Sequence, residues 1–209
     1  MYRIIVADDH AIVRKGLKMI IEDEPDLVVA EEAEDGDDFL EKIVKGTFDL
    51  IILDIGMPGR DVFDILSQLK NMRSVPPILI ITMNPEELYA KRLFNLGISG
   101  YLNKEARPEE IIRAIRAILQ GRLYITPSLA ENLAQSMFSR QRKFEGDKLT
   151  PREFQVLCHI ANGDSLTDIS SKLFLSKATV SNHRTNLLKK LQLRNNADLT
   201  QYAIKNKIL

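Results

Sequence analysis

Short apolar runs and amphipathic stretches alternate along the first 120 residues of the chain. Five runs, rich in β-branched residues, have the length of buried strands: residues 3–7, 27–33, 49–54, 77–82 and 100–103. Each is followed by apolar residues at helical spacing, and the last such stretch, 108–120, stops at Gly121. These units predict an α/β domain over residues 1–121, with a doubly wound, flavodoxin-like sheet of five parallel strands in the order 2-1-3-4-5.

After this domain the apolar positions follow helical spacing only. Residues 122–147 are expected to form a linker that contains a short helix opening at Thr126-Pro127. The apolar positions of that helix are Leu129, Leu133 and Met137. The polar tract 139–148 that follows is typical of an exposed connection.

Residues 148–209 predict an all-α domain of four helices. The first begins with a capping box, in which Thr150 and Glu153 each accept a backbone N–H of the other. A second helix over 166–173 is joined by a tight turn to Ser176, the N-cap of a third helix of roughly 15 residues. The fourth begins near Ala197. Short helices joined by a tight turn indicate a helix-turn-helix arrangement.

The distribution of charge also separates the α/β domain and its linker from the all-α domain. Residues 1–147 carry 19 Lys or Arg and 25 Asp or Glu, and residues 148–209 carry 10 and 4, so the nets are −6 and +6. Small segments can differ by a few charges without meaning, but the split also fits two domains, of which the second suits a polyanion. The single cysteine, Cys158, fits a reducing compartment. With no long apolar run and no signal peptide, the protein is expected to be cytoplasmic, with no membrane partner.

Polar residues stand where the predicted strands end. Asp8 and Asp9 follow the first strand, Asp54 the third, Thr82 the fourth and Lys104 the fifth. The carboxyl ends of parallel strands share one edge of a sheet, so these side chains should meet in one cleft. Each residue alone is more often a helix cap or a solvated charge, whereas all five together indicate chemistry.

This set suits phosphoryl transfer. A carboxylate such as Asp54 can attack a phosphoryl group if the charges of both are offset. Mg²⁺ supplies that offset through carboxylate oxygens. The Asp8–Asp9 pair would give one direct ligand and one water-mediated or helper carboxylate, and Asp54 a second direct ligand. The ammonium of Lys104 and the hydroxyl of Thr82 suit the phosphoryl oxygens.

The sequences VADDH, LDIGMPGRD, IIT and GYLNK, at these positions, resemble the motifs of the response-regulator receiver domain over residues 1–120. The resemblance implies that Asp54 accepts the phosphoryl group from a sensor histidine kinase. It also implies that the backbone carbonyl of Gly56 binds Mg²⁺ with Asp9 and Asp54. Thr82 and Tyr101 would be the switch residues, with Thr82 drawn to the phosphoryl group and Tyr101 turned inward.

Two residues depart from the usual receiver pattern. Met83 stands where the family commonly has a small residue and is expected to crowd the phosphoryl pocket. Val62 stands where a glycine is usual, so the turn after Gly59 is expected to run differently.

The third helix of the second domain has one apolar side and one polar side. Its polar residues can hydrogen-bond to base edges in a major groove, and we expect base contacts from Ser181, Asn182 and Thr185. Basic and hydroxyl side chains around that face suit phosphates: Lys177, Thr179, His183, Lys189, Lys190 and Arg194. A solvated helix face is the simpler alternative, but the basic segment and the helix-turn-helix favour DNA.

Residues 148–209 resemble the LuxR-type DNA-binding domain, through LTPREFQVL, IANGDSLTDISSKLFLSKATVSNHRTNLLKKL and RNNADLTQYA. Joined to a receiver, this implies a transcription regulator of the NarL/FixJ class. Such a regulator would form a homodimer on double-stranded DNA when phosphorylated, and could also contact RNA polymerase. The resemblance places the dimer contact on the fourth helix, at Leu199, Tyr202 and Ala203. His10 and His159 are interpreted as structural, and Cys158 as core.

Two other functions compete with this one. A phosphohydrolase could also use Asp54, Mg²⁺ and Lys104, but such enzymes typically carry a general-acid carboxylate two residues after the nucleophile, where this chain has Gly56. A regulator that dimerises and binds DNA without phosphorylation is the second alternative. The intact acidic pocket argues against it, but Met83 leaves it open. We therefore expect no conventional enzyme, only a protein that catalyses its own phosphorylation and dephosphorylation.

Overall fold

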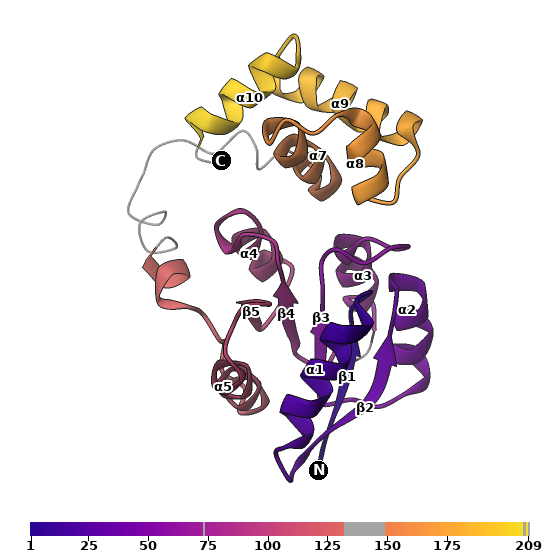
Figure 1. The fold of residues 1–209 in the computed structure, drawn as a ribbon, viewed down its shortest axis with the longest axis vertical. Coiled ribbons are helices and arrows are strands. Elements are labelled where there is room, and N and C mark those ends of the chain that lie inside the picture. Colours follow the sequence, from indigo (N-terminus) through magenta and orange to yellow (C-terminus); the bar gives the residue numbers. More distant parts are fainter. Residues whose placement is uncertain (73, 132–148, 207, 209) are drawn as a thin grey trace. The chain divides into compact units, whose positions relative to one another are not determined.

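A computed structural model describes the chain except for residues 73, 132–148, 207 and 209 (Figure 1). The chain divides into two compact units, Met1–Met137 and Phe138–Leu209. Most of the predicted linker, including Leu133, Met137 and the tract 139–148, lies outside the described residues. No helix in the described part of the chain is both long and apolar enough to cross a membrane.

The first unit contains the predicted parallel sheet. Its strands are β1 (Tyr2–Ala7), β2 (Leu27–Ala33), β3 (Leu50–Leu53), β4 (Ile78–Thr82) and β5 (Gly100–Asn103). They are hydrogen-bonded in the order β2-β1-β3-β4-β5, and each neighbouring pair is parallel, so the predicted order is confirmed.

Helices cover both faces of this sheet (Figure 1). Alternate strand residues such as Ile4 and Val6 pack with α1 (Ala11–Glu22) and α5 (Pro108–Leu119). The residues between them, such as Ile5 and Ala7, pack against three helices on the other face: α2 (Gly36–Lys45), α3 (Val62–Leu69) and α4 (Glu86–Asn95). Burial on both faces explains why the strands read as continuous apolar runs rather than as alternating patterns.

The turn before α3 accommodates the unusual residue Val62. Gly59 adopts a positive φ of 78°, which a side chain would oppose. Asp61 then caps the helix, because its carboxylate accepts the backbone N–H of Phe63 at 2.7 Å. Val62 begins α3 and is only 1 % exposed, so its side chain is part of the core.

The start of the linker is held against α4. Residues 127–131 are helical, as far as the structure describes that helix, and Leu129 is buried in the core. The Thr126 hydroxyl lies 2.7 Å from Glu86 Oε1, at the first residue of α4, and its oxygen also accepts the backbone N–H of Leu129. The predicted opening of the helix at Thr126-Pro127 is therefore confirmed.

The second unit has four described helices: α7 (Pro151–Ala161), α8 (Leu166–Lys172), α9 (Lys177–Leu191) and α10 (Asn196–Lys205). The Thr150–Glu153 capping box is present, and Ser165 and Asp168 form a second one at the start of α8. Phe174, in the turn between α8 and α9, has a φ of 52°. Cys158 is buried, as expected.

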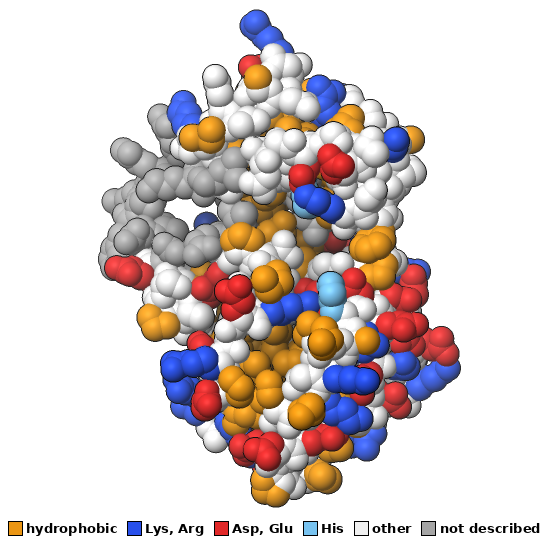
Figure 2. All heavy atoms as spheres, in the orientation of Figure 1, with side chains coloured by type: hydrophobic (Ala, Val, Ile, Leu, Met, Phe, Trp, Pro, Cys, Tyr) orange, Lys and Arg blue, Asp and Glu red, His pale blue; other side chains and the backbone are white. Residues whose placement is uncertain are grey.

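Charged side chains of both signs lie side by side on the face of the first unit that Figure 2 shows. The excess of acidic residues in this unit therefore does not form one uninterrupted acidic surface on that face.

Candidate functional site

Three of the predicted strand-end residues meet in one buried cluster. Lys104, after β5, places Nζ 2.7 Å from Asp54 Oδ2, after β3, and 2.7 Å from Asp8 Oδ2, after β1. The side chains of all three are 9 % exposed or less. The loops at the carboxyl ends of three strands thus bring together one ammonium and two carboxylates, as the strand order requires.

The charge of Lys104 is stabilised by its neighbours. Burial disfavours the charged ammonium, but hydrogen bonds to Asp54 and Asp8 outweigh burial and raise the pKa of Lys104 above its usual value. The side chain is therefore a fixed positive charge at neutral pH, in a position to offset negative charge beside Asp54.

The same loops form a candidate metal site. One ligand atom from each of Asp8, Asp9, His10 and Asp54 lies within 4.8 Å of the others. Asp54 Oδ1 is buried and has no hydrogen-bond partner among the described residues. A Cβ on Gly56 would lie 3.7 Å from Asp54 Oδ2, so the Gly56 backbone runs beside this carboxylate. Asp9 Oδ1 is likewise buried without a hydrogen-bond partner among the described residues. Clustered carboxylate oxygens, two of them unpaired, fit the hard oxygen ligands that Mg²⁺ takes.

The expected switch residues are linked through Asn84. The Thr82 hydroxyl oxygen accepts the Asn84 side-chain amide at 3.0 Å and its backbone N–H at 3.3 Å. The Tyr101 hydroxyl donates to the Asn84 carbonyl at 2.9 Å, and Tyr101 is 1 % exposed. Thr82, the loop after β4 and the inward-pointing Tyr101 therefore form one hydrogen-bonded unit.

Met83 does not fill the carboxylate pocket, contrary to expectation. It is 59 % exposed and lines an open surface hollow with Pro85, Leu102 and Ala106. Successive residues of a strand point to opposite sides, so the residue after the inward-facing Thr82 turns outward as the strand ends.

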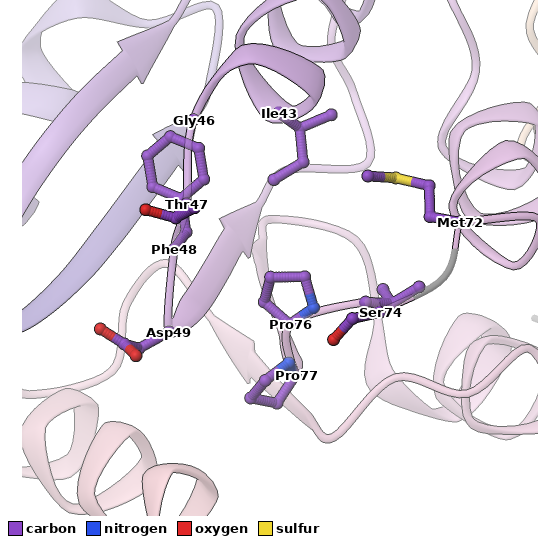
Figure 3. Close-up of a pocket in the computed structure, with 10 residues that line it drawn as sticks. Ile43, Gly46, Thr47, Phe48, Asp49, Met72, Ser74, Pro76 and Pro77 are labelled. Carbon is purple, nitrogen blue, oxygen red and sulfur yellow. The ribbon is translucent and has the colours of Figure 1, made fainter.

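A separate hollow of about 400 Å³ lies where β3 and β4 begin, and thus at the opposite end of these strands from the cluster (Figure 3). Apolar side chains line part of it, namely Ile43, Phe48, Met72, Pro76 and Pro77, and the rest of its surface is polar. The carboxylate of Asp49 in its wall already accepts the backbone N–H of Arg3 at 2.7 Å. This hollow therefore offers no set of reactive groups comparable with the cluster around Asp54.

In the second unit, α9 presents the expected polar face. Val180, Leu187 and Leu191 are buried, whereas all three residues expected to contact bases are exposed: Ser181, Asn182 and Thr185. Lys177, Lys189 and Arg194 are also exposed, and Thr179 and His183 are partly so. The Thr185 hydroxyl donates to the Ser181 carbonyl at 2.9 Å, which leaves its oxygen as an acceptor.

Lys190, expected to contact phosphate, instead holds two helices together. Its Nζ lies 2.7 Å from Glu153 Oε2, and this carboxylate also accepts the Thr150 backbone N–H at 2.7 Å. Burial raises the pKa of Glu153, but the bonds from Lys190 and Thr150 outweigh it and leave the pKa below its usual value. Lys190 thereby joins α9 to the first turn of α7. Helical spacing could not reveal this partner, which lies 37 residues away.

The expected dimer contact on α10 also needs correction. Leu199 and Ala203 are fully buried in the core of their own domain, where α10 packs on α7, and Tyr202 is only partly exposed. Apolar spacing on an amphipathic helix identifies its core side first. The exposed side of α10 carries Ala197, Gln201 and Ile204, and Ile204 is 59 % exposed.

The comparisons with known protein families match both units. Residues 4–116 match the response regulator receiver domain, and residues 147–203 match the LuxR family of bacterial regulatory proteins. The chain is 34 % identical to the oxygen regulatory protein NreC of Staphylococcus epidermidis and 33 % identical to that of Staphylococcus carnosus, over 99 % of each chain.

Solved structures give the same result. RcsB of Salmonella enterica serovar Typhimurium, bound to a promoter in the presence of a phosphomimetic, has a TM-score of 0.67 and 27 % identity. That match covers 96 % of this chain and 97 % of RcsB. The response regulator ChrA of a heme-sensing two-component system has a TM-score of 0.54 and 31 % identity, with 100 % and 98 % covered.

Proposed function

Because the chain belongs to the NarL/FixJ response regulators, transcription regulators that join a receiver domain to a LuxR-type DNA-binding domain, we propose that phosphorylation of Asp54 controls its binding to DNA. The donor is the phosphohistidine of a sensor histidine kinase. The observation that carries the proposal is the buried, unpaired Asp54 Oδ1 beside a carboxylate oxygen that Lys104 already holds.

The reaction moves one phosphoryl group between two proteins. Asp54 Oδ1 attacks phosphorus, the new P–O bond forms as the donor's P–N bond breaks, and the imidazole leaves. Bound through Asp9, Asp54 and the Gly56 carbonyl, with Asp8 through water, Mg²⁺ would supply further positive charge for the phosphoryl oxygens. Lys104 places its fixed positive charge near the phosphoryl oxygens, and the Thr82 hydroxyl can donate a hydrogen bond to one of them.

Thr82 then couples the reaction to the surface. If the Thr82 hydroxyl turns toward a new phosphoryl oxygen, it gives up the two hydrogen bonds that it accepts from Asn84. Since Tyr101 also binds Asn84, both residues and the loop before α4 respond together. This supports their role as the switch.

In the second unit, α9 reads DNA. Ser181, Asn182 and Thr185 contact base edges, while Lys177, Thr179, His183, Lys189 and Arg194 lie near phosphates. Lys190 positions the helix instead. Phosphorylation promotes a homodimer that places two such helices on adjacent half-sites, with the exposed side of α10 as the contact. Solved structures of RcsB bound to a promoter and of RcsB dimers bound to DNA support this arrangement.

The test of the proposal is mass measurement after treatment with a small phosphodonor and Mg²⁺. The wild-type chain should gain about 80 Da, the mass of one phosphoryl group, and Asp54→Ala should gain nothing, because it removes the nucleophile. Asp64→Ala, a matched change at an exposed carboxylate of α3, should label like the wild type.

Each alternative function predicts a different result. A phosphohydrolase would release phosphate rapidly without a lasting mass increase, and a regulator independent of phosphorylation would show neither label nor turnover. Labelling of Asp54→Ala at Asp8 or Asp9 would show that the nucleophile is misassigned.

A further inference from the structure

The receiver site contains a nitrogen donor that its proposed Mg²⁺ chemistry does not use. His10 Nδ1 lies 2.7 Å from Asp9 Oδ1 and 3.3 Å from Asp8 Oδ1. We propose that this site also binds a divalent transition-metal ion, with His10 Nδ1 as a ligand beside the carboxylates of Asp9 and Asp54. The proposal depends on the metal site inferred above, but not on phosphoryl transfer.

The backbone holds His10 in a suitable place. Its N–H donates to Asp8 Oδ1 at 2.9 Å, and it is the N-cap residue of α1, although its side chain makes no capping hydrogen bond. The side chain is 62 % exposed, so the ring can turn without disturbing the core. The main chain therefore points an adjustable imidazole at the carboxylates.

A cluster of acidic residues alone would not indicate an ion, but Asp54 adds an independent observation. Asp54 is 4 % exposed, and its Oδ1 has no hydrogen-bond partner in the described part of the chain. A buried carboxylate oxygen is costly to leave unpaired. A cation shared with Asp9 and His10 would satisfy it.

The charges also suit a divalent ion. Asp8, Asp9 and Asp54 contribute three negative charges and Lys104 one positive charge, so the cluster has a net charge of −2. A neutral imidazole adds a ligand without changing this balance. Asp9 Oδ1, 2.7 Å from Nδ1, is buried and accepts no hydrogen bond from the described residues, so a metal ion bound between these two atoms would satisfy it as well.

Ligand type then separates the candidate ions. Mg²⁺ prefers oxygen and keeps several waters, so an imidazole adds little to its binding. Imidazole is a good ligand for Zn²⁺ and Ni²⁺, and affinity rises from Mn²⁺ to Ni²⁺. His10 should therefore strengthen the binding of transition metals selectively, and such ions would compete with Mg²⁺ for the same carboxylates.

Two measurements on the full chain test this. Electron spin-echo spectroscopy of bound Mn²⁺ should detect a directly coordinated nitrogen in the wild type and not in His10→Asn. Calorimetric titration should show Ni²⁺ binding weakened by at least about 10-fold in His10→Asn, with Mg²⁺ binding changed by less than about 2-fold. Asn is a favoured N-cap residue, so the variant should keep α1 intact. His159→Asn, in the other unit, is the matched control and should bind both ions as the wild type does, because His159 pairs with Asp164 and lies outside the metal site.

The outcomes distinguish this inference from the proposed function. Mn²⁺ that binds without nitrogen coupling, or equal Ni²⁺ affinity in wild type and His10→Asn, would overturn the role of His10 alone. Failure of the wild type to bind either Mn²⁺ or Mg²⁺ would overturn the metal site and, with it, the proposed Mg²⁺-dependent chemistry.

Discussion

At the scale of single residues, Gln192 shows how one backbone angle limits stability. It ends α9 with a φ of 54° and a ψ of 39°, and the N–H of the next residue, Leu193, bonds to the Leu188 carbonyl at 2.9 Å. This left-handed ending is normally made by glycine, because a side chain costs about 1–2 kcal/mol there. We predict that Gln192→Gly raises the free energy of unfolding of the second unit. The expected gain is about 0.5–1 kcal/mol, once the greater flexibility of the unfolded glycine is subtracted.

Thermal unfolding monitored by circular dichroism measures this effect. Gln201→Gly is the matched control, since the same change at an exposed position inside α10 should cost about 1 kcal/mol. If both variants lose stability, the left-handed conformation at Gln192 is not the limiting feature.

At the scale of elements, two adjacent lysines on α9 should behave differently. Lys189 is exposed and forms no ion pair with the described residues, whereas Lys190 joins α9 to Glu153 of α7. Lys189→Ala should therefore make the log–log dependence of DNA affinity on salt shallower by about 0.9, the contribution of one phosphate contact. Lys190→Ala should leave that slope unchanged but lower the stability of the helix pair, because it leaves the buried Glu153 carboxylate without its cation.

Binding titrations over a series of salt concentrations, together with unfolding curves, separate the two roles. A shallower slope in Lys190→Ala, with unchanged stability, would return Lys190 to the phosphate contacts expected from the helical pattern.

At the scale of the whole molecule, dimerisation should determine affinity. The buried Leu199 and Ala203 leave Ile204 as the large apolar residue on the exposed side of α10. We predict that Ile204→Asp reduces the affinity of the phosphorylated full-length protein for a duplex with two half-sites to that for a single half-site. The reason is that two like charges would face each other across a two-fold contact.

Electrophoretic mobility shifts with one-site and two-site duplexes measure the difference. Val44→Asp places the same charge at an exposed apolar position of the first unit, 72 % exposed, and should leave DNA binding unchanged. Cooperative binding by Ile204→Asp equal to that of the wild type would exclude this side of α10 as the contact.

Local patterns in the sequence were sufficient for the elements and for much of the candidate receiver site. Apolar runs and capping residues such as Thr150 and Ser176 act within a few residues. They therefore placed the five strands, α5 and the helices of the second unit to within a residue or two. The parallel strand order then brings Asp8, Asp54 and Lys104 to one edge, because the carboxyl ends of parallel strands all lie at the same edge of the sheet.

Tertiary structure decided which partner each side chain takes. Glu153 pairs with Lys190, 37 positions away, and α7 covers Leu199 and Ala203. The sequence alone assigns Lys190 to DNA phosphate and the other two residues to a dimer contact. His10 could be read as structural until the loop after β1 placed its ring against Asp9. Periodicity specifies the side of an element on which a residue lies, whereas only the packed chain determines whether a neighbouring element, a metal ion or another molecule meets that side.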